Sequence, residues 1–291
     1  MACEGHIEVE GGKVWYRIVG DGKTGVPLLT LHGGPGYPHD YLEPLEALAD
    51  ERPVIFYDQL GCGRSAGPAD PALWRADRFV RELAQVRKSL RLDRVHVYGH
   101  SWGTMLAVDS FLGGASVTSL ILASPALSIP RWLEDASVYR AALPADVQAI
   151  LARHEAAGTT HTSEYHDATM EYYHRYLCRM DPWPDAMNRS HDASSGEVYL
   201  EMWGPSEFHT TGNLRDYDRT GRLGEINVPT LYTCGGYDEA TPGSTAWYQS
   251  LTPGAELAVF EHSAHMPHLE ETDRYLTVVR EFLHRVNCSN A

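Results

Sequence analysis

The stretch Val95-His96-Val97-Tyr98-Gly99-His100-Ser101-Trp102-Gly103-Thr104-Met105-Leu106-Ala107 determines how the rest of this chain is interpreted. A short apolar run with β-branched residues leads into Gly-x-Ser-x-Gly and then into a helix-forming run. This is the strand, sharp turn and helix of a nucleophile elbow, a setting that makes the common five-residue pattern more specific. Gly99 and Gly103 flank the serine because neighbouring backbone comes too close there for a Cβ atom. We therefore expect Ser101 to stand above the edge of a sheet as a nucleophile.

Composition limits the class of protein. The 291 residues include 24 basic and 39 acidic side chains, which gives a net charge of −15 at pH 7, and 43% of the residues are hydrophobic. That length and apolar content suffice for one large or two ordinary domains with a buried core. The acidic balance makes nucleic acids and anionic membranes poor partners. It suits a cationic or amine-bearing substrate, although surplus acid also simply keeps a protein soluble.

The cysteines and the first residues indicate a reducing compartment. The five cysteines are scattered, without a CxxC pair, so neither a disulfide framework nor a zinc site is indicated. The first residues lack the basic and apolar regions of a leader, and no run approaches the length of a membrane span. The expected location is the cytoplasm. The cysteines are Cys3, Cys62, Cys178, Cys234 and Cys288.

Apolar runs alternate with helical periodicity along the first part of the chain. An alternating hairpin at residues 5–19 suggests a sheet edge. Helices are expected at 41–50 and 77–90. Strands alternating with helices imply a parallel sheet with right-handed crossovers and a site at the carboxyl ends of the strands. Strands are expected at 26–31, 53–57, 119–124 and immediately before Ser101.

A glycine-rich loop, His32-Gly33-Gly34-Pro35-Gly36, follows the strand at 26–31. Its glycines allow backbone N–H groups to point into a cleft, and Pro35 has no N–H to offer. Such a loop is more often a phosphate cradle or a plain turn than an oxyanion hole. The phosphate interpretation needs a Lys-Ser/Thr or G-x-G-x-x-G continuation, and neither follows.

The alternation breaks between residues 125 and 223 and resumes with a strand at 228–234. The interrupted segment has no convincing strand and is rich in Trp and Tyr. We expect one α/β core, residues 1–125 and 224–291, with a helical cap at 126–223 inserted in it, because the core's last strand and helix follow the insertion. Some of the cap aromatics should line a substrate pocket. Helices are expected in the cap at 132–143, 145–157, 164–177 and 198–203.

The resumed core supplies an acid and a base for Ser101. Asp238 follows the strand at 228–234, and His265 follows a strand at 257–260. The serine needs an imidazole to take its proton, and the imidazole needs a carboxylate to fix its tautomer. Two neighbouring histidines compete with His265. His262 lies too near the strand, and His268 is expected to open the terminal helix, which leaves His265 at the apex of the loop.

At this point the chain resembles the proline iminopeptidases and related aminopeptidases and amino-acid amidases of the α/β-hydrolase superfamily, including the archaeal tricorn-interacting aminopeptidase. The likeness spans nearly the whole chain. A His-Gly-Gly-Pro-Gly loop combined with a Trp after the serine is far more specific than the elbow alone. The motifs that carry the resemblance are, in order, His32-Gly33-Gly34-Pro35-Gly36, Asp58-Gln59-Leu60-Gly61-x-Gly63-x-Ser65, Gly99-x-Ser101-Trp102-Gly103, Gly204-Pro205-x-Glu207-Phe208, Asp238-Glu239 and His265.

The resemblance implies an α/β-hydrolase fold, with a mostly parallel sheet flanked by helices and an inserted helical cap. It also implies a function: release of an N-terminal amino acid from a small peptide or amino-acid amide through an acyl-enzyme, without metal or organic cofactor. Two acids holding the free α-amino group are physically sensible, because carboxylates bind ammonium through charge-assisted hydrogen bonds. The implied site comprises Ser101, Asp238 and His265 as the triad, Gly34 (or Gly33) and Trp102 as oxyanion donors, and Gly33, Glu207 and Glu239 at the substrate.

Two other functions stay open from the residues. An esterase or lactonase would use the same triad, but a neutral acyl group gains nothing from Glu207 and Glu239. A hydrolase-like protein that binds a small molecule with little turnover is disfavoured by an intact triad and oxyanion loop. Epoxide hydrolases and dehalogenases need an aspartate where Ser101 stands. The preferred side chain, the leaving group and the oligomeric state do not follow from the sequence.

Overall fold

The computed structural model describes residues 2–65, 67–68 and 70–289. Across these residues one eight-stranded sheet runs in the order β1-β2-β4-β3-β5-β6-β7-β8. The strands β1, β2 and β4 pair antiparallel, and every pairing from β4 onward is parallel. The mostly parallel sheet of the prediction is confirmed. The strands are β1 (Ala2–Val9), β2 (Gly12–Val19), β3 (Leu28–Leu31), β4 (Val54–Tyr57), β5 (His96–His100), β6 (Ser119–Ala123), β7 (Thr230–Gly235) and β8 (Glu256–Phe260).

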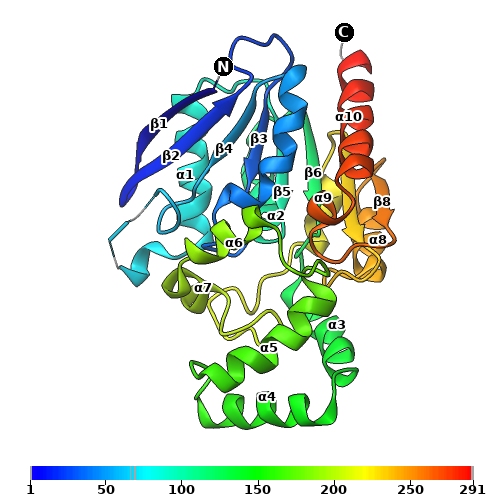
Figure 1. Cartoon of the computed structure of the whole chain (residues 1–291). Helices are drawn as coiled ribbons and strands as arrows, with labels where there is room; N and C mark the ends of the chain where they lie inside the picture. The colour runs from blue at the N-terminus through cyan, green and yellow to red at the C-terminus, as the bar shows by residue number, and fades with distance from the viewer. Residues whose placement is uncertain (1, 66, 69, 290–291) are drawn as a thin grey trace.

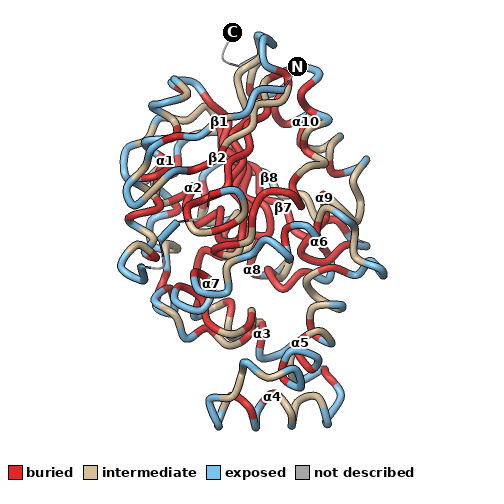
Figure 2. Tube along the Cα trace, turned by 60° about the vertical axis from the view of Figure 1, so that its left-hand side comes forward, coloured by how far each residue is buried: buried red, intermediate tan, exposed pale blue. Residues whose placement is uncertain are grey.

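Both faces of the parallel strands are buried, which explains their continuous apolar runs. Alternate residues point to opposite faces, so neighbours such as Leu28 and Leu29 enter different hydrophobic cores. One core packs against α1 (Ala76–Ser89), α2 (Trp102–Leu112) and α8 (Pro242–Leu251). The other packs against η1 (His39–Asp50) and α10 (Thr272–Ser289). Figure 2 shows the buried residues concentrated along the strands between these layers.

Between β6 and β7 the chain forms helices and loops that add nothing to the sheet. Figure 1 shows α3, α4 and α5 gathered at the end of the molecule opposite the two chain termini. These elements account for the break in alternation that the sequence shows at 125–223. The helices are α3 (Ile129–Ala141), α4 (Ala145–Ala157), α5 (Ser163–Tyr176), α6 (Asp185–Asp192), α7 (Gly196–Met202) and the short η3 (Thr220–Glu225).

Two elements differ from the sequence prediction. The helix expected at 41–50 is the 3₁₀ helix η1, which contains Pro44; a proline there removes a backbone donor and disfavours a regular α-helix. The helix α6 was not predicted, because it has only eight residues and just two of them, Ala186 and Met187, are apolar. It packs on η1 through Ser190, whose hydroxyl donates to Pro38 O at 2.9 Å and accepts from Tyr41 N at 2.9 Å.

The parallel strands bring the predicted site residues to one edge of the sheet. His32, Asp58 and Ser101 each directly follow a strand, as predicted, and the loops bearing Asp238 and His265 follow β7 and β8. Two short helices, η2 (Pro71–Leu73) and α9 (Pro267–Glu270), complete the described elements. Within the described ranges, no helix combines the length and apolar content needed to cross a bilayer.

Candidate active site

Ser101 occupies the sharp turn between β5 and α2. Its backbone has φ 53° and ψ −121°, a conformation that residues with a Cβ rarely adopt. The flanking glycines permit this turn. A Cβ on Gly99 would lie 2.4 Å from Gly103 O, and one on Gly103 would lie 2.1 Å from Leu31 O. The close backbone approach predicted from Gly-x-Ser-x-Gly is confirmed.

Asp238 and His265 meet beside this turn. Nδ1 of His265 lies 2.7 Å from Oδ1 of Asp238, and both side chains are buried. Asp238 also accepts from Ala240 N at 2.7 Å, from Gly235 N at 3.2 Å and from the hydroxyl of Ser124 at 2.7 Å. The carboxylate is therefore fixed, and a proton on Nδ1 leaves Nε2 of His265 as the basic nitrogen.

Ser101 and His265 line the same cavity, which has a volume of about 180 Å³. One wall is the glycine loop, with Gly33, Gly34 and Gly36. Another wall comes from the segment between β6 and β7. It contributes aromatic side chains, as expected from the sequence, and polar ones: Tyr173, Leu177, Trp183, His191, Ser194, Ser195, Tyr199 and Glu207.

The glycine loop and α2 present backbone donors near Ser101. Gly33 N donates to the Tyr41 hydroxyl at 2.8 Å, so this N–H is occupied. Gly34 follows it in the loop, lines the cavity and has φ +104°, a conformation suited to glycine. Trp102 is the first residue of α2, where a backbone N–H has no acceptor within the helix. We therefore propose Gly34, rather than Gly33, and Trp102 as the pair of oxyanion donors.

Two glutamates, the buried Glu239 and the half-buried Glu207, lie next to the proposed triad. Glu239 is 1% exposed, and its Oε1 lies 4.0 Å from Nε2 of His265. Glu207 lines the cavity; its Oε1 accepts from the Tyr199 hydroxyl at 2.7 Å, and its backbone oxygen accepts from Trp132 Nε1 at 2.7 Å. Oε2 of Glu207 and both carboxylate oxygens of Glu239 are buried without a hydrogen-bond partner among the described residues.

The burial of these carboxyl groups sets their protonation. Removal from water raises the pKa of Glu207 to about 7, although the hydrogen bond from Tyr199 opposes the shift. Burial, followed by the charges of Glu207 and Asp238, raises the pKa of Glu239 well above its usual range. Both shifts favour the protonated form of these carboxyl groups.

Comparison with known proteins shows which family the chain belongs to. A model of the α/β hydrolase fold family matches residues 26–272. A proline iminopeptidase of Heyndrickxia coagulans is 46% identical over 288 residues, covering 98% of this chain and 100% of the relative. The crystal structure of a Mycobacterium smegmatis proline iminopeptidase matches with a TM-score of 0.90 at 35% identity, over 99% of this chain and 100% of that one. The crystal structure of VinJ matches with a TM-score of 0.94 at 36% identity, over 98% and 99%.

The chain belongs to the proline iminopeptidase family of α/β-hydrolases. Membership makes it an enzyme, a serine aminopeptidase of the α/β-hydrolase class. The resemblance drawn from the sequence motifs and the predicted fold class are both confirmed.

Sequence reasoning missed Ser124, which lies in this iminopeptidase-family site at the end of β6. Its backbone has φ 48°, and its hydroxyl lies 2.7 Å from Asp238 Oδ2 and 3.1 Å from His265 O. It helps to hold both the acid and the base. The available signal was its position, since Ser124 directly follows a strand next to β5.

The two competing histidines have other surroundings. His262 is exposed, and its backbone N donates to Glu271 at 3.1 Å. His268 does not open the terminal helix as expected. It lies inside α9, fully buried, and neither ring nitrogen has a hydrogen-bond partner among the described residues. Its ring packs against His100 with centroids 5.1 Å apart, so it fills space below the site.

The Asp58-Gln59 pair joins the loops beneath the cavity. The Gln59 side chain donates to His32 O at 3.0 Å and accepts from Trp102 Nε1 at 2.8 Å. The Asp58 carboxylate accepts from His39 N at 3.1 Å and from Arg64 N at 2.9 Å. These bonds between loops explain the motif without giving it a part in the chemistry.

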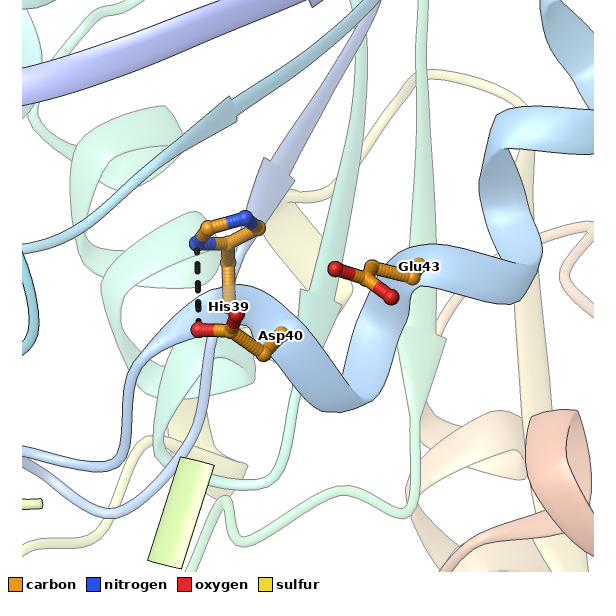
Figure 3. A group of neighbouring side chains, drawn as sticks. All are labelled: His39, Asp40 and Glu43. Carbon is orange, nitrogen blue, oxygen red and sulfur yellow. Dashed lines mark ion pairs between the residues drawn. The ribbon is translucent and has the colours of Figure 1, made fainter. Parts of the chain in front are cut away.

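Figure 3 shows a group of potential metal ligands on η1: His39, Asp40 and Glu43, whose ligand atoms lie within 4.8 Å of one another. The acids are already paired with cations. Arg64 donates to both oxygens of Asp40 at 3.0 Å, and Arg189 pairs with Glu43. We therefore interpret the group as an ion-pair network that joins η1 to α6.

Proposed function

We propose that this enzyme releases an N-terminal amino acid, proline or another small or apolar residue, from peptides or amino-acid amides through an acyl-enzyme. The observation that carries the proposal is a set of three carboxylate oxygens of Glu207 and Glu239 beside His265, which are buried without a hydrogen-bond partner among the described residues. Buried charges are costly unless they are paired. A substrate ammonium supplies the missing partner and returns the lost hydrogen bonds.

The proposed reaction is acyl transfer. Ser101 Oγ attacks the carbonyl carbon of the N-terminal residue while its proton passes to Nε2 of His265, and Asp238 stabilises the resulting imidazolium. The backbone N–H groups of Gly34 and Trp102 hold the oxyanion. His265 then gives its proton to the leaving amine, the C–N bond breaks, and water hydrolyses the ester on Ser101 by the same route.

The proximity of Glu239 to His265 supports an exopeptidase. An α-ammonium held by Glu239 lies two bonds from the carbonyl carbon, so the scissile bond is the first one in the chain. An N-acetylated substrate has no ammonium, and its binding would leave the carboxylates of Glu207 and Glu239 buried without partners. A neutral ester has no use for them, which favours the aminopeptidase over an esterase or lactonase.

We also propose that residues 126–223 act as a cap over a core formed by 1–125 and 224–291. The cap contributes Glu207 and the aromatic side chains of the cavity wall, which suit an apolar N-terminal residue. The relatives named proline iminopeptidase support proline as that residue. The proposed partner is thus a small peptide or amide with a free amino group, and the proposed setting is the cytoplasm.

A substrate panel tests this function. Aminoacyl 4-nitroanilides, beginning with proline, are compared with their N-acetylated forms and with simple 4-nitrophenyl esters. We expect rapid cleavage of the free-amine anilides and at least about 100-fold lower kcat/KM for the acetylated forms, since two charge-assisted hydrogen bonds are lost. Hydrolysis of esters alone would indicate an esterase or lactonase. Binding without turnover of any substrate would indicate a hydrolase-like binding protein.

A further inference from the structure

A buried chain of hydrogen bonds joins the glycine loop to the loop that carries His265. Gly33 N lies 2.8 Å from the Tyr41 hydroxyl, which lies 2.9 Å from Nδ1 of His100. On the other side of the same ring, Nε2 of His100 lies 2.9 Å from the backbone oxygen of His265. Tyr41 and His100 are each 1% exposed, and both line the cavity that contains Ser101.

The chemistry of the groups fixes the direction of every bond. A carbonyl oxygen only accepts, so Nε2 of His100 carries the proton that it donates to His265 O. Burial, together with the neighbouring His265 and His268 rings, lowers the pKa of His100 well below its usual range, so the ring is neutral. Nδ1 is then an acceptor, and it takes the Tyr41 proton. The Tyr41 oxygen in turn accepts from Gly33 N–H.

This series of hydrogen bonds passes next to Ser101, the proposed nucleophile. His100 precedes Ser101 in the sequence, and a Cβ placed on Gly33 would lie 3.2 Å from Ser101 Cβ and 3.1 Å from the Tyr41 hydroxyl. Gly33 is thus in contact with the elbow, and a small shift of its loop changes the distance from Ser101 to the next N–H of the loop. Catalytic geometry tolerates such shifts poorly.

We propose that Tyr41 and His100 are positioning residues, which hold the oxyanion loop and the His265 loop at a fixed separation on either side of Ser101. The proposal rests on the function proposed above for Ser101 and His265. A purely space-filling part would not require this bonding.

The first test removes one link at a time. Tyr41→Phe deletes only the shared hydroxyl. Tyr98→Phe is the matched control, since the buried Tyr98 hydroxyl bonds Tyr275 at 2.9 Å and makes none of the bonds of this network. We expect Tyr41→Phe to lower kcat about 10- to 100-fold on anilide and ester alike, with KM within about twofold of wild type. Tyr98→Phe should keep kcat even if it lowers the melting temperature equally. An equal kcat for the two variants would overturn the proposal.

The second test examines the hydrogen bond from His100 to His265 separately from the bonds through Tyr41. His100→Gln can still place an N–H donor toward His265 O, whereas His100→Leu cannot, so the glutamine variant should retain more kcat than the leucine variant. Wild-type His100 should also show the ¹⁵N shifts of a neutral ring protonated at Nε2, assigned by its loss in His100→Gln. A ring protonated at Nδ1, or equal kcat for both variants, would overturn the proposal. An enzyme that cleaves esters but no anilide would refute the proposed function alone, because the ester kinetics still test positioning.

Discussion

Oε1 of Glu239 lies 4.0 Å from Nε2 of His265, the ring nitrogen that does not face Asp238. One short segment therefore places two acids against one imidazole. Asp238 contacts the ring at Nδ1, while Glu239 lies on the Nε2 side of the ring. In the proposed function, an ammonium bound at Glu239 would also hold the carbonyl carbon near His265, the proposed base.

Substitution of Ser101 should separate chemistry from stability. Both Ser101→Ala and Ser101→Gly should abolish turnover and labelling by a fluorophosphonate. The glycine variant should be the more stable of the two by about 1 to 3 kcal/mol, because glycine relieves the strain of φ 53° at this position. Urea denaturation gives the difference. Substantial turnover by a clean Ser101→Ala preparation would place the nucleophile elsewhere.

The acid and base can be tested with a histidine control. Asp238→Asn keeps the shape of the side chain but favours the wrong imidazole tautomer, so kcat should fall by roughly 10³ to 10⁴. His265→Ala should abolish activity, whereas His262→Ala should leave it intact, because His262 is exposed. Steady-state kinetics on proline 4-nitroanilide measure all three. Loss of activity in His262→Ala instead would show that the wrong residue of this loop was chosen.

The pH dependence of substrate binding follows from Glu207. Its pKa is raised to about 7, so below that pH the carboxyl is neutral and cannot pair with an ammonium. KM for a free-amine substrate should fall as pH rises through about 7, then rise again as the substrate's own amine deprotonates near about 8. His265 acts on both substrates, so its titration cancels in the ratio of kcat/KM for the anilide to kcat/KM for the ester. A ratio that does not vary between pH 6 and 8 would contradict this account.

The pKa shift of Glu239 predicts that the protein becomes less stable as pH rises. Its folded pKa is raised above the unfolded value, so the native state binds the proton more tightly and loses stability as pH rises from the unfolded pKa through the folded one. Glu239→Gln removes that loss and should stabilise the protein by about 1 to 3 kcal/mol at pH 8, and by less at pH 5. Urea denaturation at both pH values measures it, with the exposed Glu281→Gln as control. A gain independent of pH would contradict the prediction.

The secondary-structure elements and the positions of the proposed triad could be predicted because their signals are local in the sequence. Strand ends, glycine spacing around Ser101 and the order Ser, Asp, His are all short-range signals. The chain from Gly33 through Tyr41 to His100 was not predicted, because its members come together only when η1 packs beside β5. Packing of that kind leaves no periodic trace in the sequence.

The role of Glu207 was predicted only from the family resemblance. A glutamate between cap helices is ordinarily solvated, and nothing local to it predicts that its Oε2 is buried without a partner. Its environment depends on Tyr199 and Trp132, which lie on two different helices of the cap. Burial that depends on distant segments of the chain could therefore not be predicted from the residues around Glu207.

The most direct test of the account is the effect of Glu207→Gln on two substrates. On proline 4-nitroanilide, loss of one charged hydrogen bond of roughly 1.5 to 3 kcal/mol should lower kcat/KM by about one to two orders of magnitude. On 4-nitrophenyl acetate, which has no ammonium, kcat/KM should change less than about threefold. Equal losses on both substrates would contradict the claim that Glu207 and Glu239 select a free amino terminus.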